Sequence, residues 1–311
     1  MRLMQVLLEE TQKPKAVIMA GGAGAGKTYL LDQLNLGSLT NYNPDKYVED
    51  KDHPYYNNLS AASGQVAKDV EAASEKGESF VWDTTASNPS KVSELIGKGY
   101  DVFMVMVYTH PMISFIANFS RERRIPKVAV FQTWSNVYKL IDDYKKMLGE
   151  DFALYINDRG GKYSKEVEAF NKAASNGAKG VEKYLAQYME ENGGEEAFAS
   201  TFRKEVGLPA ELEKKFQEII KGANIDQSDE ASMKPLRKDF EKYAHHYESG
   251  KYGKDRLENL FKKALETRQK LKDNEEAILG DIAEMLHNPT FQELLKHSSE
   301  KEIDSKLQKF L

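Results

Sequence analysis

Cysteine is absent from the 311-residue sequence, which excludes disulfides and thiolate metal sites. The six histidines show no H-E-x-x-H or similar ligand spacing, so a structural zinc site is not expected. No apolar run approaches the length of a transmembrane span, and the run near the first residue is too short for a signal peptide. We therefore expect a cytoplasmic protein with no membrane partner, acting in the host cytoplasm if a phage encodes it.

The sequence also lacks net positive charge. Its formal charge is −5, which argues against a protein held to nucleic acid by bulk positive charge. The net charge does not exclude a local basic groove. The composition, with 40% hydrophobic and 30% charged residues, is typical of a globular protein. The length is sufficient for two domains, each with a core of its own.

The firmest functional signal is the octet at residues 21–28, which satisfies the pattern G-x-x-x-x-G-K-[ST] of a phosphate-binding P-loop. An apolar run leads into the octet and a helical pattern follows from its lysine. Glycines allow successive N–H groups to turn inward and surround phosphate oxygens. The lysine would place its charge at the β/γ-phosphates, and the threonine would bind Mg²⁺. The expected ATP-binding residues are Gly21, Gly22, Ala23, Gly24, Ala25, Gly26, Lys27, Thr28 and Tyr29, with Lys27 also catalytic and Thr28 also a metal ligand.

Strand and helix patterns alternate through residue 160, which predicts an α/β fold of the kinase-type P-loop NTPase class, a doubly wound parallel sheet. The expected strands cover 16–20, 39–43, 79–85, 101–108 and 152–157, and the expected helices include 60–76, 87–97 and 128–148. The strand at 101–108 is almost unbroken in its apolar residues, as expected when helices cover both faces of a sheet.

After residue 160 the sequence becomes charged and helical, with no further strand pattern. Apolar residues recur at helical spacing over 166–189, with interruptions at Gly177 and Gly180, and over 278–295, divided at Asn288 and Pro289. The polar stretch 222–235 is interpreted as a linker. We predict a P-loop kinase domain at 1–160 and an all-α C-terminal region at 161–311, which carries no site signature and could bind a protein partner.

Two aspartates follow expected strands, at the sheet edge where ligands of open parallel sheets collect. Asp83 ends the strand at 79–85 and would reach the Mg²⁺ shell. Asp45 follows the strand at 39–43 and would accept the proton of a substrate hydroxyl. Each also has a structural interpretation, because Asp45 could cap a turn and Asp83 could be a polar strand terminus.

The residues around these aspartates distinguish among P-loop classes. Thr84 stands where hydrolytic ATPases usually place a glutamate, and the N-K-x-D motif of GTPases is absent. A basic cluster follows the strand at 101–108, and its arginines would neutralise charge on the transferred phosphoryl group. We predict Arg121 and Arg124 as catalytic and Arg123 as an alternative phosphate ligand, although the three could also form a solvated helix face.

These motifs resemble the zeta-toxin-like P-loop kinases, a family that includes kinases of UDP-N-acetylglucosamine. The resemblance runs from about residue 15 to 157 and rests on the P-loop, Asn43-Pro44-Asp45, His53-Pro54-Tyr55, Asp83-Thr84-Thr85, Gly99-Tyr100 and the R-x-x-R-x-P spacing at 121–126. It implies ATP and Mg²⁺ as cofactors, Asp45 as the base, and Arg121 and Arg124 as ATP-phosphate ligands.

The sequence departs from the family pattern at two places. Tyr47-Val48 stands where the toxins usually carry an arginine, with a longer spacing to His53-Pro54. The family's acidic residue that meets the sugar is replaced or shifted at Asp83-Thr84-Thr85. The departures leave kinase chemistry better supported than a sugar-nucleotide acceptor.

The leading hypothesis is an ATP- and Mg²⁺-dependent kinase acting on a hydroxyl of a small molecule, such as a nucleotide sugar. A polynucleotide or RNA 5′-hydroxyl kinase is the second hypothesis, and a nucleotide-gated protein-binding module with little turnover is the third. Trp134 is interpreted as a core residue, and Asn157 either lies near the adenine or forms a turn. The local basic surface that supports the second hypothesis consists of Lys46, Arg121, Arg123, Arg124 and Lys127.

Overall fold

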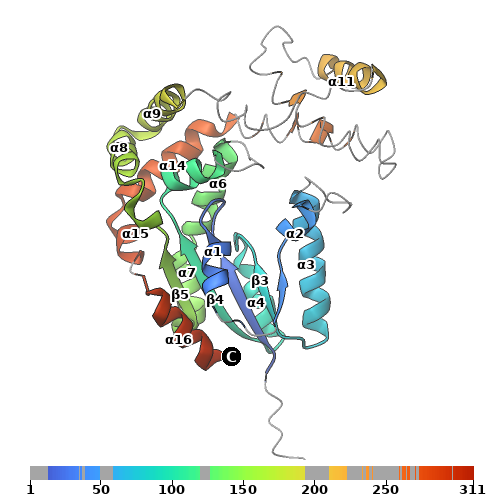
Figure 1. Ribbon diagram of the computed structural model, residues 1–311, viewed down its shortest axis with the longest axis vertical. Helices are drawn as coiled ribbons and strands as arrows, with labels where there is room; N and C mark the ends of the chain where they lie inside the picture. Colours follow the sequence, from blue (N-terminus) through green and yellow to red (C-terminus); the bar gives the residue numbers. More distant parts are fainter. Residues whose placement is uncertain are drawn as a thin grey trace, which may run out of the picture.

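The computed structural model describes residues 13–34, 36, 39–49, 59–119, 127–192, 210–222, 273–295 and 297–311, with scattered residues between 233 and 270. At its centre lies a parallel five-stranded sheet in the order β2-β3-β1-β4-β5 (Figure 1). This confirms the predicted α/β fold with a parallel sheet. The strands are β1 (Lys15–Ala20), β2 (Thr40–Tyr42), β3 (Phe80–Asp83), β4 (Asp101–Tyr108) and β5 (Phe152–Ile156).

Side chains alternate along the strands and divide between two hydrophobic clusters, one on each face of the sheet. In β1, Ile18 belongs to one cluster, whereas Val17 and Met19 belong to the other. The first face is covered by α3 (Leu59–Glu75), α4 (Pro89–Gly97), α5 (Pro111–Phe119), α6 (Lys127–Tyr138) and α7 (Ile141–Leu148). The second face is covered by α1 (Lys27–Gln33) and α16 (Glu300–Phe310). Burial on both faces explains the continuous apolar run of β4.

The prediction of a single helix over 128–148 is wrong, because the structure divides this segment into α6 and α7 at Lys139 and Leu140. No glycine or proline marks this division. The aromatic residues Tyr138 and Tyr144 on its two sides are both fully buried in the same cluster. Tertiary burial therefore sets the division, which local sequence signals do not predict.

The expected interruption at Gly180 is also wrong, since α9 (Gly177–Glu191) continues through it. The helix begins at Gly177, which adopts a left-handed φ of 68° after α8 (Ser164–Ala174). A Cβ at Gly180 would lie 2.1 Å from the carbonyl oxygen of Ala173. Gly180 therefore allows a close approach of α8 and α9 and does not end a helix.

The helices after residue 160 share a core with the sheet. Buried residues of α8, α9, α14 (Glu275–His287) and α15 (Pro289–Leu294) belong to the same cluster as those of β4 and α6. The predicted division of the helical pattern over 278–295 at Asn288 is confirmed, because the Asn288 side chain accepts hydrogen bonds at the N-terminus of α15. On the other sheet face, Ile303 and Leu307 of α16 are fully buried.

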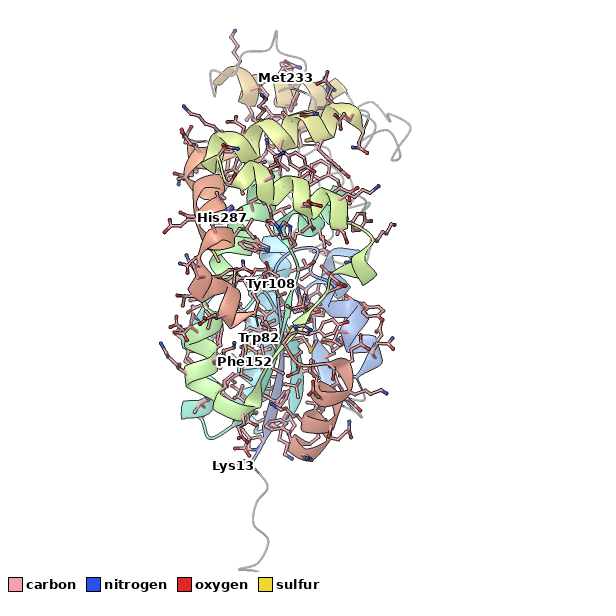
Figure 2. The ribbon with its side chains drawn as sticks, turned by 90° about the vertical axis from the view of Figure 1, so that its left-hand side faces the viewer. Lys13, Trp82, Tyr108, Phe152, Met233 and His287 are labelled. Carbon is pink, nitrogen blue, oxygen red and sulfur yellow. The ribbon has the colours of Figure 1, made fainter. Side chains whose placement is uncertain are left out.

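A smaller hydrophobic cluster centres on α11 (Ala210–Gly222), where Phe216 packs with Phe240 and Phe261. Figure 1 shows α11 away from the sheet, and Figure 2 places Met233, which packs against this cluster, at the opposite end of the molecule from Lys13. Within the described part of the chain, no helix is long and apolar enough to cross a membrane.

Candidate active site

The P-loop lies at the carboxyl end of β1, between the ends of β3 and β4, because β1 is the central strand. Helix α1 begins at Lys27, as the motif predicts, with Gly26 as its N-cap in the left-handed conformation at φ 90°. A turn precedes the helix, closed by a hydrogen bond from the Ala25 N–H to the Gly22 carbonyl at 3.2 Å. The loop therefore has the tight backbone that phosphate binding needs.

Two glycines of the loop are required by close contacts as well as by φ. A Cβ at Gly24 would lie 2.8 Å from the backbone carbonyl oxygen of Ser114, and Gly24 has a φ of 75°. A Cβ at Gly26 would lie 2.2 Å from Asn157 Nδ2. Any larger residue would displace the loop from the helix and strand end that support it.

A chain of polar contacts joins the P-loop to the ends of β3 and β2. Lys27 Nζ donates a hydrogen bond to the Gly21 carbonyl at 3.1 Å and lies 3.6 Å from Asp83 Oδ1. Asn43 Nδ2 donates to Asp83 Oδ2 at 3.2 Å, and the Asn43 side-chain oxygen accepts from the Asp45 N–H at 2.8 Å. Asp83 is 5% exposed, so its charge is held among these partners and away from bulk water. One asparagine thus links the Asp83 carboxylate to the backbone of Asp45.

The same residues line a pocket of about 210 Å³. Ala23, Lys27 and Thr28 border it from the P-loop, and Asp45 and Asp83 border it from the two neighbouring strand ends. Trp82, Thr84 and Thr85 lie on the same wall and also line an adjoining pocket of about 130 Å³ beside α4. One cavity therefore brings the predicted phosphate, metal and base residues together, with room beside them.

The pocket offers few side chains that could bind Mg²⁺. Among the described residues, no group of three or more histidine, aspartate or glutamate side chains could hold a metal ion. Mg²⁺ beside nucleotide phosphates usually takes only one or two protein ligands, because it keeps several waters and binds the phosphates themselves. The Asp83 carboxylate and the Thr28 hydroxyl, which line the same pocket, fit that pattern.

Other predicted site residues are placed differently. Tyr29 is 51% exposed on α1 and does not line the pocket. Arg121, Arg123 and Arg124 lie outside the described residues, as does His53-Pro54-Tyr55. Lys127, assigned to a basic surface, forms an ion pair with Glu275 of α14 at 2.8 Å, so its charge is already compensated.

Three residues that hold the P-loop were not predicted in that role. The Tyr138 hydroxyl accepts a hydrogen bond from the Gly22 N–H at 3.1 Å and donates to the Val107 carbonyl at 2.7 Å. Burial raises the pKa of Tyr138 well above its usual range, which keeps the hydroxyl protonated for this bond. Asn157 and Arg159, which follow β5, donate to carbonyls of the loop. In the sequence, the one indication of this role is Asn157, a polar residue directly after β5.

Deeper in the structure, His110 connects the end of β4 to the helical region. Its Nδ1 accepts from the Met112 N–H at 3.2 Å, which leaves the Nε2 hydrogen to donate to Asn171 Oδ1 of α8 at 2.9 Å. Burial lowers the pKa of His110 from 6.5 to about 4, so the ring is neutral at physiological pH. Trp134 is fully buried and donates to the Thr109 carbonyl at 2.8 Å, as expected of a core residue.

Comparison with known proteins finds one family model and several solved structures to which part of the chain is similar. The family model of the zeta toxin matches residues 3–127, and no curated protein matches the chain. A solved chain of the PezAT chromosomal toxin–antitoxin system of Streptococcus pneumoniae has 20% identity and a TM-score of 0.38, covering 51% of this chain and 75% of that one. A chain of the AvrRxo1-ORF1:-ORF2 complex has 16% identity and a TM-score of 0.36, covering 50% of this chain and 58% of that one. Residues 3–127 are therefore similar to the zeta toxin family, which consists of P-loop phosphotransferases.

Proposed function

We propose that the chain is an ATP- and Mg²⁺-dependent kinase that transfers the γ-phosphoryl group to a hydroxyl of a small molecule such as a nucleotide sugar. One observation carries the proposal: the P-loop, Asp83 and Asp45 line a single pocket, in which Asn43 bonds both the Asp83 carboxylate and the Asp45 N–H. The zeta toxin region supports the reaction class, because that family consists of P-loop phosphotransferases that use ATP.

In this proposal the P-loop N–H groups and Lys27 bind the phosphates of ATP. Asp45, half-buried at the start of α2 (Asp45–Glu49), accepts the proton of the acceptor hydroxyl as its oxygen bonds to the γ-phosphorus. The bond from the γ-phosphorus to the bridging oxygen breaks, and ADP leaves. Thr28 and Asp83 would hold Mg²⁺, which when bound neutralises negative charge on the phosphates.

The basic cluster completes the proposed site. Asn118 of α5 lines the pocket, and Arg121 follows it by three residues. We assign Arg121 and Arg124 to the transferred phosphoryl group, with Arg123 as the alternative ligand. Arginine suits this role because its charge is permanent and its donors match phosphate oxygens.

The test is transfer of labelled γ-phosphate from ATP, with nucleotide sugars, nucleosides and 5′-hydroxyl oligonucleotides as acceptors. Lys27→Ala is expected to abolish labelling. Asp45→Asn should keep ADP affinity and lose transfer by about 100-fold or more, the usual worth of a general base. Asp32→Asn, which removes a carboxylate from the exposed side of α1, is the matched control and should transfer normally.

The outcome also decides between the alternatives. Labelling of oligonucleotides alone, with binding that weakens steeply as salt rises, would identify a polynucleotide kinase. Tight ADP binding with no labelled acceptor would overturn the kinase proposal and leave a nucleotide-gated module whose helical region binds a protein partner. Normal transfer by Asp45→Asn would remove Asp45 from the role of base.

A further inference from the structure

The loop after β5 contacts the P-loop through residues that do not line the pocket. Asn157 Nδ2 donates a hydrogen bond to the Ala25 carbonyl at 2.8 Å, and Arg159 Nη2 donates to the Gly24 carbonyl at 3.2 Å. Neither Asn157 nor Arg159 lines the pocket, whereas Gly24, Ala25 and Gly26 do. These two donors therefore act on the outer surface of the loop that would hold the phosphates.

Peptide geometry connects the outer carbonyls to the inner N–H groups. In a trans peptide, the C=O of one residue and the N–H of the next point in opposite directions. A donor that holds the Ala25 carbonyl outward therefore turns the Gly26 N–H inward. The Gly24–Ala25 peptide is fixed at both ends, because Arg159 binds its carbonyl and its N–H closes the turn to Gly22.

Asn157 is itself held firmly in place. It is 6% exposed, its N–H donates to the Tyr108 carbonyl at 2.8 Å, and its carbonyl accepts from the Thr109 hydroxyl at 2.6 Å. Both partners are at the end of β4. The absence of a Cβ at Gly26 leaves room for the Asn157 amide, which a Cβ would approach to 2.2 Å. The contact therefore requires glycine at position 26.

Arg159 reaches the P-loop through an uncommon backbone conformation. Its φ is 58°, in the left-handed region, which is unfavourable for a residue with a side chain. The conformation is maintained by neighbours, since the Arg159 N–H donates to Asn157 Oδ1 at 3.2 Å and the Gly160 N–H donates to Asp158 Oδ1 at 2.8 Å. Strain of this kind persists where the surrounding contacts fix it, which is common at ligand sites.

We propose that Asn157 and Arg159 are positioning residues of the nucleotide site. Asn157 holds the Ala25 carbonyl so that the Gly26 N–H faces the phosphates, and Arg159 holds the Gly24 carbonyl so that the turn to Gly22 stays closed before ATP arrives. The inference rests on the proposed function in one respect: it takes the P-loop as the site that binds the phosphates of the nucleotide. Because ATP and its transition state use the same N–H groups, loss of either residue should raise KM for ATP and leave kcat nearly unchanged.

The test measures binding of ADP with Mg²⁺ to the full chain by calorimetry, together with KM and kcat for ATP. Asn157→Asp keeps the shape but presents an oxygen to the Ala25 carbonyl, and should weaken ADP binding by about 10-fold or more. Arg159→Met removes one hydrogen bond and should weaken binding by about 5-fold. Arg159→Lys retains a donor and should recover most of that loss. Lys162→Met, an exposed cation beside Tyr163, should bind ADP normally.

Thermal unfolding separates positioning from stability. A purely structural role would lower the unfolding temperature and leave ADP affinity of the folded protein unchanged, and that result would overturn the inference. If Asn157→Asp does not fold, the Arg159→Met and Arg159→Lys pair decides, because Arg159 is partly exposed. ADP binding needs no acceptor, so a wild-type chain that binds ADP without transfer would contradict the proposed function and leave this inference standing.

Discussion

The P-loop and the helices after residue 160 differ in how individual residues determine their structure. In the P-loop, single positions are fixed by backbone contacts, as at Gly24 and Gly26. In the helical region, burial follows a repeated spacing, as in α9, where Val181, Leu185 and Met189 are buried. The comparison teaches that the first region depends on particular residues and the second on periodic packing. Substitutions should therefore affect function in one region and stability in the other.

The largest effect is expected for Gly26→Ala. The added Cβ meets Asn157 Nδ2 at 2.2 Å, and the residue has a φ of 90°, so the loop must move. We expect ADP affinity to fall by at least about 100-fold, measured by calorimetry on the folded variant. Unchanged affinity would mean that the loop tolerates displacement, and the distinction between the two regions would fail.

Leu307→Ala tests whether a helix far along the chain stabilises the sheet. Leu307 is fully buried against the sheet face that carries α1, so its truncation should cost about 2–5 kcal/mol in the free energy of unfolding. Chemical denaturation of the whole chain measures the loss. Lys306→Ala, on the exposed side of the same helix, is the control and should change stability by less than about 0.5 kcal/mol.

Gly180→Ala and Gly280→Ala form a matched pair within the helical region. A Cβ at Gly180 meets the Ala173 carbonyl at 2.1 Å, whereas one at Gly280 of α14 has nothing within 4 Å. We expect Gly180→Ala to destabilise by about 1–3 kcal/mol and Gly280→Ala to stabilise by up to about 1 kcal/mol. Both variants should bind ADP like the wild type once folded. A loss of affinity in Gly180→Ala would show that the helical region acts on the site.

The smallest effect near neutral pH is a pH dependence of stability at His110, where the end of β4 meets the helical region. Its pKa is about 4 in the folded chain and near 6.5 when unfolded, so the unfolded chain binds more protons between these values. The free energy of unfolding should therefore fall as the pH drops from 6.5 toward 4, by up to about 1.4 kcal/mol per pH unit. His110→Asn should flatten this slope in urea titrations at several pH values. If the variant shows the same slope, titratable groups other than His110 cause the pH dependence.

The sequence predicted those parts of the site that depend on local patterns. The octet at 21–28 predicts a strand, a phosphate loop and a helix start, and the apolar run before Asp83 predicts a strand-end carboxylate. Tyr138 and Arg159 could not be assigned, because their contacts with the loop join residues that are 116 and 135 positions apart. Gly177 and Gly180 both look like helix breaks in the sequence, and only packing against Ala173 distinguishes them.

Helix α16 has a consequence for synthesis of the chain. The sheet face above Val17 and Val105 is completed by Ile303 and Leu307, and Lys15 at the start of β1 donates to the carbonyls of Phe310 and Leu311. A ribosome adds residue 310 to the chain 295 positions after residue 15, although the two residues are neighbours in the folded protein. Since N-terminal segments usually fold first, the apolar surface of this sheet waits for residues 300–310. The phosphate loop, which follows the central strand β1, therefore reaches its final support only after residues 300–310 have been made.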